Sequence, residues 1–223
     1  MKQNLEQLIA RFRQDALDTV EPHLWSDEAV TRWLNDAQAE AAVRGRLLYE
    51  SDLPAVCAVA VIAGTAGYAL HASLYEITHL SLKEQGDACT WPVLLKSTEW
   101  LDENVRNWRD LEGRPQWAVQ TDTRLRLVPR PIAGAALRLE GYRLPIKQMV
   151  GDNDAPEIHT AHHRHLVHWA LHRGYSQPDS DGRDPGKAET AYAEFERYFG
   201  LRPDADLRRA TQIDEPQVNK VHL

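Results

Sequence analysis

Residues 154–200 read DAPEIHTAHHRHLVHWALHRGYSQPDSDGRDPGKAETAYAEFERYFG, and this stretch decides the fold that we expect for the chain. Its second half has apolar residues at the spacing of an amphipathic helix, and Gly200 follows where a helix would stop. The residues of this stripe are Ala188, Ala191, Tyr192, Phe195, Tyr198 and Phe199. The first half predicts another helix that begins near Pro156, with an apolar face of Leu166, Val167, Ala170 and Leu171.

The two predicted helices are joined by residues 176–186, which contain two prolines, two glycines and three aspartates. A helix does not continue through such a composition, so the stretch predicts a helical hairpin with a polar, exposed connection. Each helix alone would leave its apolar stripe in water. The hairpin must therefore pack on an earlier part of the chain.

Two further helices are expected near the N-terminus. The first has an apolar stripe within residues 5–16 and ends before Glu21-Pro22. The second begins after Ser26, a favourable N-cap that is followed by two acidic residues, and continues to about Leu48. We predict that this second helix packs against the hairpin, because all three helices have apolar stripes that need cover.

The middle of the chain has the shorter periodicity of strands. Strands are expected over residues 55–63, 74–80, 92–95, 117–119, 125–128 and 135–142, and a helix from Ser97 to near Gly113. Residues 55–63 could instead form a buried helix, since short apolar runs do not distinguish the two.

This order of elements predicts an α+β fold, in which the N- and C-terminal helices form a bundle around a central β-rich insertion. The expected division is residues 1–50 with 151–201 for the helical domain and 51–150 for the insertion, which includes one helix. Residues 202–223 lack apolar periodicity and are expected to form a C-terminal arm.

The composition excludes several classes of protein. The 223 residues carry a net charge of -7, which argues against a general nucleic-acid binder. Cys57 and Cys89 form no metal-binding pattern and fit a reduced compartment. The longest apolar run, residues 53–63, is too short to span a membrane as a helix, and the N-terminus lacks the pattern of a signal peptide.

The densest polar feature is a group of six histidines: His159, His162, His163, His165, His168 and His172. His165, His168 and His172 share a helix face, and two such imidazoles can bind zinc. However, the chain lacks the HExxH pattern, and no third ligand or general base is evident. We therefore expect a solvated or interface helix that requires no metal or other cofactor. Its charge can respond to pH, because histidine titrates near neutrality.

Other chemical patterns are incomplete. Asp179, Asp181 and Asp184 lack the spacing and the closing glutamate of a calcium loop. Residues 182–187 lack the spacing of a phosphate-binding loop, and Ala188 follows Lys187 where Ser or Thr is required. No serine lies in a nucleophile elbow. The sequence therefore does not support an enzyme.

Several short signatures occur in a recognisable order between residues 24 and 201. They are Trp25-Ser26-Asp27-Glu28, Leu34-Asn35-Asp36-Ala37, Gly113-Arg114-Pro115, Leu127-Val128-Pro129-Arg130-Pro131, Leu144-Pro145, and residues 166–175, 179–181 and 195–200. In their order and spacing, the chain resembles the head-to-tail adaptor, or connector, proteins of tailed bacteriophages, the group related to tail tubular protein A.

This resemblance implies a structural virion protein at the head-tail junction. Such adaptors form a homo-oligomeric ring, twelve-fold in relatives, beneath the portal ring and extend the DNA channel toward the tail. The implied partners are the portal protein, a tail or nozzle protein and further copies of the chain. Genome DNA would pass without specific binding, no membrane is involved, and assembly would take place in the host cytoplasm.

The expected arm would order on a partner, because its few apolar residues cannot form a core. Its candidate partner-binding residues are Arg202, Leu207, Arg208, Arg209, Ile213 and Val218. Two alternatives from other classes stay open at this point. One is a metal-dependent enzyme built on the histidine helix, and the other is a small regulatory binding module.

Overall fold

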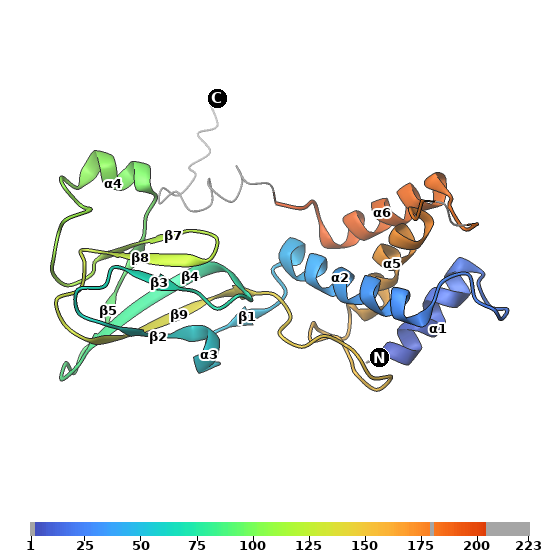
Figure 1. Ribbon diagram of the computed structural model, residues 1–223, viewed down its shortest axis with the longest axis horizontal. Helices are drawn as coiled ribbons and strands as arrows, with labels where there is room; N and C mark the ends of the chain where they lie inside the picture. Colours follow the sequence, from blue (N-terminus) through green and yellow to red (C-terminus); the bar gives the residue numbers. More distant parts are fainter. Residues whose placement is uncertain (1–2, 179–180, 204–223) are drawn as a thin grey trace, which may run out of the picture. The chain divides into compact units, whose positions relative to one another are not determined.

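The computed structural model describes residues 3–178 and 181–203 (Figure 1). The described residues form a mixed α and β structure with six α-helices, one short 3₁₀-helix and two β-sheets. They divide into two compact units. Of the described residues, those up to Leu48 and residues 143–202 form the helical unit, and residues 49–142 with Pro203 form the β unit.

Four α-helices build the helical unit: α1 (Leu5–Ala16), α2 (Asp27–Gly45), α5 (Leu166–Tyr175) and α6 (Pro185–Phe199). Side chains at the N-caps fix where three of them begin. Asn4 and Gln7 form a capping box on α1, Ser26 accepts a hydrogen bond from the backbone of α2, and Asp184 does the same for α6. The helix α2 ends at Gly45, so Leu48 lies beyond the helix that was expected to include it.

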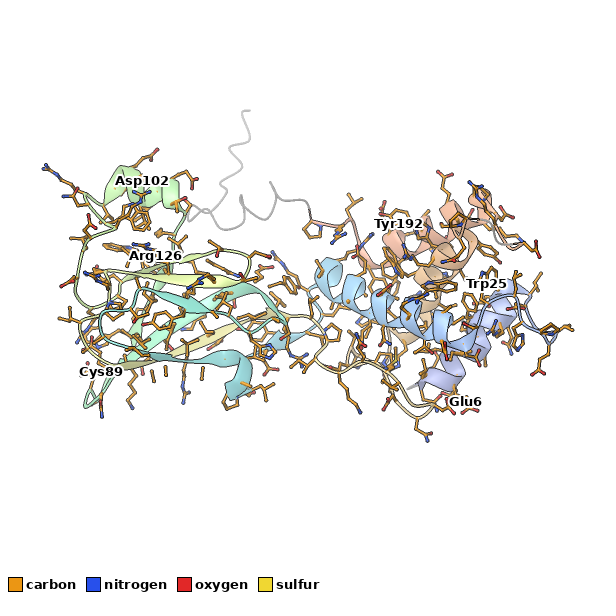
Figure 2. The ribbon with its side chains drawn as sticks, in the orientation of Figure 1. Glu6, Trp25, Cys89, Asp102, Arg126 and Tyr192 are labelled. Atoms are coloured by element: carbon orange, nitrogen blue, oxygen red, sulfur yellow. The ribbon has the colours of Figure 1, made fainter. Side chains whose placement is uncertain are left out.

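The helical unit has one continuous apolar core. Phe12, Trp33 and Phe195 are among its fully buried side chains, and each comes from a different helix. The expected contact between α2 and the hairpin is present, since α2 packs on both α5 and α6. Trp25 adds edge-on aromatic contacts with Phe12 and Tyr175, at ring-centroid distances of 5.5 and 5.6 Å (Figure 2).

The first helix of the hairpin begins later than the sequence suggests. Residues 156–162 form no helix, and a 3₁₀-helix (His163–His165) leads into α5. The reason is a set of tertiary hydrogen bonds made by Glu157. Its amide donates to Gln38 Oε1, and its carboxylate accepts hydrogen bonds from Arg143 and from the backbone of Ile146.

Nine strands and two short helices form the β unit. The strands are β1 (Tyr49–Glu50), β2 (Ala58–Val61), β3 (Gly67–Ala69), β4 (Leu74–Glu84), β5 (Trp91–Pro92), β6 (Leu94–Leu95), β7 (Trp117–Gln120), β8 (Arg124–Val128) and β9 (Ala135–Arg143). The helices are α3 (Pro54–Cys57) and α4 (Thr98–Asn104).

The strands form two sheets that share one core. The first sheet has the order β1-β9-β4-β5, with β2 also paired to β9, and the second has the order β3-β8-β7-β6. Their pairing is antiparallel wherever its direction is established, except between β6 and β7, which run parallel. Leucines from β4, β8 and β9 meet in this core.

A second, smaller core lies on the other face of β7 and β8. On β7, Ala118 belongs to the core between the sheets, whereas the next residue, Val119, packs with Leu101 of α4 and Trp108. Arg126 of β8 also lies against Trp108, with its guanidinium 5.2 Å from the ring centroid (Figure 2). The second sheet is therefore covered on both faces.

Three sequence-based boundaries in the β unit were wrong. Residues 55–63 begin as helix α3, which has Pro54 at its first turn, and continue as strand β2. Residues 92–95 do not form one strand, because β5 joins the first sheet and β6 joins the second. The helix from Ser97 ends at Asn104, because Val105 is already extended.

Candidate partner-binding site

The expected arm starts where α6 ends, so the C-terminal end of α6 is the first candidate for a functional site. Gly200 caps α6 with φ +90°, and its amide donates to the carbonyl oxygen of Glu196 at 2.8 Å. A left-handed φ favours glycine, which explains why the stop signal in the sequence was read correctly. From Gly200 the chain continues to Arg202 and Pro203, the last described residues.

Arg44 of α2 holds this end of α6 in place. Its side chain is only 1% exposed. The guanidinium donates to the carbonyl oxygen of Gly200 at 3.2 Å, to the hydroxyl of Tyr192 at 3.2 Å and to Glu40 Oε1 at 2.9 Å. Three donors of one buried cation therefore connect α2, the middle of α6 and the residue after α6.

The charge of Arg44 is stabilised by its surroundings. Burial disfavours the charge, but hydrogen bonds with Tyr192 and Glu40 outweigh this effect, so the pKa of Arg44 lies above its ordinary value. The guanidinium also lies 5.3–5.6 Å from the ring centroids of Trp169, Tyr192 and Phe195. The guanidinium group at the α2–α6 junction is therefore surrounded by aromatic side chains.

Glu40 links the Arg44 guanidinium to the start of the arm. Its carboxylate side chain is 11% exposed and lies 3.7 Å from the Nε atom of Arg202, which is itself 63% exposed. Among the candidate partner-binding residues, Arg202 is therefore placed beside α2. The others, Leu207, Arg208, Arg209, Ile213 and Val218, lie outside the described residues.

The candidate metal ligands are engaged in other interactions. His172 donates a hydrogen bond from Nδ1 to the carbonyl oxygen of Ala188 at 3.0 Å, and the ring of His165 stacks on Tyr198 with centroids 3.5 Å apart. His165 Nε2 accepts a hydrogen bond from Arg164 Nε at 2.9 Å. Burial, followed by the charge of Arg164, lowers the pKa of His165 to about 4.

The three histidines do not form a metal-binding group. Over residues 3–178 and 181–203, the structure contains no cluster of three or more His, Cys, Asp or Glu side chains that could hold a metal ion. The rings of His165 and His168 lie 5.8 Å apart, whereas His172 contacts Trp169 and Tyr192. Asp179 of the loose calcium-loop pattern lies outside the described residues.

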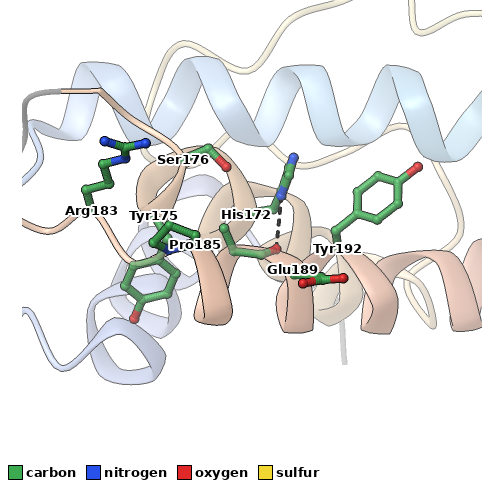
Figure 3. Close-up of a pocket in the computed structure, with 8 residues that line it drawn as sticks. His172, Tyr175, Ser176, Arg183, Pro185, Glu189 and Tyr192 are labelled. Carbon is green, nitrogen blue, oxygen red and sulfur yellow. Dashed lines mark hydrogen bonds between the residues drawn. The ribbon is translucent and has the colours of Figure 1, made fainter.

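A pocket of about 360 Å³ lies beside His172, between the end of α5 and the start of α6 (Figure 3). Its lining residues are His172, Tyr175, Ser176, Arg183, Pro185, Ala188, Glu189 and Tyr192. The imidazole of His172 is hydrogen-bonded to the carbonyl oxygen of Ala188, as the dashed line in Figure 3 shows. Tyr192 lines this pocket and also accepts a hydrogen bond from Arg44, so the pocket borders the α2–α6 junction.

A second buried arginine was missed in the sequence. Arg13 of α1 is 6% exposed and donates to Asp18, to the carbonyl oxygen of Trp25 at 2.5 Å and to Asp27 at 2.6 Å. Burial opposes the charge of Asp18, but hydrogen bonds from Leu24 and Arg13 outweigh it and lower its pKa. The α1–α2 loop is thus fixed around one cation, and no local pattern in the sequence signals this.

The loop before α6 contacts the same region. A Cβ atom on Gly182 would lie 2.4 Å from the side chain of Leu24 and 2.6 Å from that of Trp25. Glycine at this position therefore allows the hairpin connection to approach the Trp25 signature.

No helix in the described part of the chain is long and apolar enough to cross a membrane.

Comparison with known proteins gives the identity of this architecture. A search of curated proteins finds no match to the chain. The family described as SU10 adaptor protein matches residues 3–218, which is nearly the whole chain and includes both units. This family indicates a structural adaptor protein of a bacteriophage rather than an enzyme, and it agrees with the resemblance carried by the short signatures. The chain therefore belongs to the SU10 adaptor protein family, whose description fits a phage head-to-tail adaptor.

Proposed function

We propose that the protein is the subunit of a ring that binds beneath the portal of a phage head and extends the DNA channel toward the tail. The observation that carries the proposal is the family match over residues 3–218. The ring is a homo-oligomer, with a dodecamer as its expected size, and its partners are the portal protein and a tail or nozzle protein. Genome DNA passes through it without sequence-specific binding.

The proposed working parts follow the expected domain boundaries. Residues 1–50 and 151–201 form a helical bundle domain, residues 51–150 form a β-rich insertion, and residues 202–223 form the arm. In support, the described helices before residue 48 and after residue 143 share one apolar core. The β unit has its own two cores.

The arm is the proposed partner-binding element, and it docks on the portal or on a neighbouring subunit. Its anchor supports this role, because Arg44 holds Gly200 and Glu40 lies beside Arg202. A fixed starting point reduces the conformational entropy that an arm loses when it orders on a partner. The candidate contact residues are Arg202, Leu207, Arg208, Arg209, Ile213 and Val218.

The ring and the arm can be tested separately. Native mass spectrometry of the purified protein with portal rings should detect a complex with many adaptor copies. A chain truncated after Pro203 should keep the melting temperature of the full chain but no longer attach to portal rings. Undiminished attachment of the truncated chain would overturn the role of the arm, and a portal mixture without any adaptor complex would overturn the proposed function.

A matched pair of point variants tests the anchor. Arg202→Ala removes a cation that is 63% exposed and lies beside Glu40, whereas Arg197→Ala removes a cation that is 77% exposed and pairs with Glu194 on α6. Only Arg202→Ala should weaken attachment to portal rings. A metal analysis of the same preparations separates this function from a metal-dependent enzyme, since stoichiometric metal is expected only for the enzyme.

A further inference from the structure

The histidine-rich segment is not explained by the proposed function. Residues 158–173 contain six histidines, Arg164 and Arg173, and no acidic residue, in a chain whose net charge is -7. Only His163 of these histidines is fully buried. The segment therefore places a concentration of basic groups at the surface of an acidic protein.

Arg164 of this segment and Arg11 of α1 line the same hollow. The Arg11–Arg164 hollow has a volume of about 320 Å³ and is lined by Gln3, Arg11, Thr160, Ala161 and Arg164. Gln3 precedes α1 and Arg11 lies in it, whereas Thr160 and Ala161 lie in the turn before the 3₁₀-helix and Arg164 lies in that helix. Among the described residues, no carboxylate lines the hollow.

The walls of this hollow are fixed by hydrogen bonds. The Nε2 atom of the fully buried His163 lies 3.0 Å from the carbonyl oxygen of Ile158, and its Nδ1 atom lies 3.0 Å from the carbonyl oxygen and 3.3 Å from the amide nitrogen of Gln3. The amide of Ala161 donates to His159 Nδ1 at 3.3 Å, and Arg164 Nε donates to His165. A ligand would therefore find the site already formed, which lowers the entropic cost of binding.

Arg11 and Arg164 place two positive charges at the hollow. The pKa of His165 falls to about 4, first because of burial, then because of Arg164, with a smaller contribution from Arg11. The pKa of His162 is also lowered, by burial and by the charges of neighbouring histidines. One carboxylate is close: Asp15 Oδ2 lies 3.4 Å from Arg11 Nε, but both side chains are exposed by about a third or more. Such an exposed pair is weak, so a bound anion can compete with it.

We propose that the Arg11–Arg164 hollow is a binding site for a phosphate group. The two guanidinium groups, one from α1 and one from the 3₁₀-helix before α5, would donate charge-assisted hydrogen bonds, and the Thr160 hydroxyl would donate another. Donors that approach from different directions suit the several oxygens of a tetrahedral phosphate better than a planar carboxylate. The proposal goes beyond the adaptor role, and it does not require a ring because all of its residues come from one subunit.

Titration of the isotope-labelled full-length protein with inorganic phosphate tests the site, with chloride at the same ionic strength as the reference. Saturable NMR shifts are expected at the amides of Thr160 and Ala161 and at the side chains of Arg11 and Arg164. Arg11→Gln and Arg164→Gln should each weaken binding by about tenfold, as expected for loss of a charge-assisted hydrogen bond. Both arginines are exposed, so neither variant should disturb the fold.

Arg32→Gln is the matched control, because Arg32 is exposed on α2 of the same unit and does not line the hollow. Absence of saturable shifts at the hollow would overturn the proposal, as would an equal loss of affinity in the control. Fluorescence anisotropy with a short labelled DNA duplex then identifies the source of the phosphate. A duplex that binds and is weakened by the two hollow variants alone supports the DNA backbone as ligand. Phosphate binding without duplex binding supports a free phosphate at the same site.

Discussion

The side chain of Arg44, in the last turn of α2, donates a hydrogen bond to the backbone carbonyl oxygen of Gly200, 156 residues later in the chain. A helix end has carbonyl groups without partners inside the helix, and a buried guanidinium can satisfy several acceptors at once. The same guanidinium also binds Glu40 and Tyr192. One side chain therefore connects α2 to the residue that caps the last helix of the helical unit.

Replacement of Arg44 by Met should lower the free energy of unfolding of the helical unit by about 3–5 kcal/mol, because the largely buried charge of Glu40 would keep only the exposed Arg202 as an ionic partner. Urea unfolding followed by circular dichroism measures this loss. The control is Arg197→Met, which breaks an exposed ion pair with Glu194 and should cost less than about 1 kcal/mol. Equal losses of unfolding free energy in the two variants would show that the buried ion pair contributes no more to stability than the exposed one.

Gly141→Ala should strongly destabilise the β unit. A Cβ atom at this position would lie 2.1 Å from the backbone oxygen of Glu76 and 3.0 Å from the Cα atom of Ile77, so the backbones of β4 and β9 would have to separate. We expect a loss of at least about 3 kcal/mol. Gly67→Ala is the control, since its Cβ would meet only the end of the Arg124 side chain at 3.5 Å. Hydrogen exchange of the β4 amides should report the difference, and an unaffected Gly141→Ala variant would contradict the close approach.

Phe195→Ala should cost about 3–5 kcal/mol, because the side chain is fully buried and contacts Trp169 and Phe199 as well as Arg44. Leu201→Ala provides the comparison, as its side chain is 74% exposed and should change stability by no more than about 0.5 kcal/mol. Calorimetry measures both. A Phe195→Ala protein that melts at the temperature of the original chain would rule out this packing of α6.

The helical unit should lose stability as the pH falls from neutrality. The pKa values of His162, His165 and His168 lie below the ordinary value of 6.5, mainly because burial disfavours their charged forms, and His165 is lowered to about 4. At a pH between the ordinary value of 6.5 and the lowered pKa values of the folded chain, the unfolded chain binds more protons than the folded chain, so protonation favours unfolding. The carboxylates of this unit with lowered pKa, Asp18, Asp154 and Glu194, act in the same direction but only below their ordinary values, which are 3.8 for aspartate and 4.5 for glutamate.

Melting temperatures measured between pH 7 and 4.5 test this dependence. His165→Gln should flatten the slope, because it removes the histidine whose pKa is lowered to about 4. His79→Gln, at an exposed position of β4 in the other unit, should leave the slope of the helical unit unchanged. A slope that is the same in all three proteins would refute the assignment.

The helices with strong local signals were predicted well from the sequence. The stripe from Ala188 to Phe199, together with the stop at Gly200, corresponds to α6, because its caps and its periodicity are both local. Ser26 was recognised as the cap of α2 for the same reason. In these segments the local preference and the tertiary structure agree.

The errors occur where distant residues decide the local structure. Residues 156–162 are not helical because Glu157 is held by Gln38 and Arg143, and neither partner is near it in the sequence. The split of residues 92–95 depends on which sheet each strand joins, which no local pattern encodes. Arg44 was missed because a buried arginine has the same local signature as the many exposed ones, and its partners Tyr192 and Gly200 lie about 150 residues away.

The division of the helical unit between the two ends of the chain has a consequence for synthesis on the ribosome. All strands of the β unit lie in one uninterrupted segment, residues 49–143, and have been made before α5 begins. In contrast, α1 and α2 emerge first but lack the α5 and α6 faces that complete their core until the last quarter of the chain has been translated. Domains fold as units once their residues are available. The middle of the nascent chain can therefore fold first, while its earliest helices keep their apolar faces exposed and depend most on chaperones.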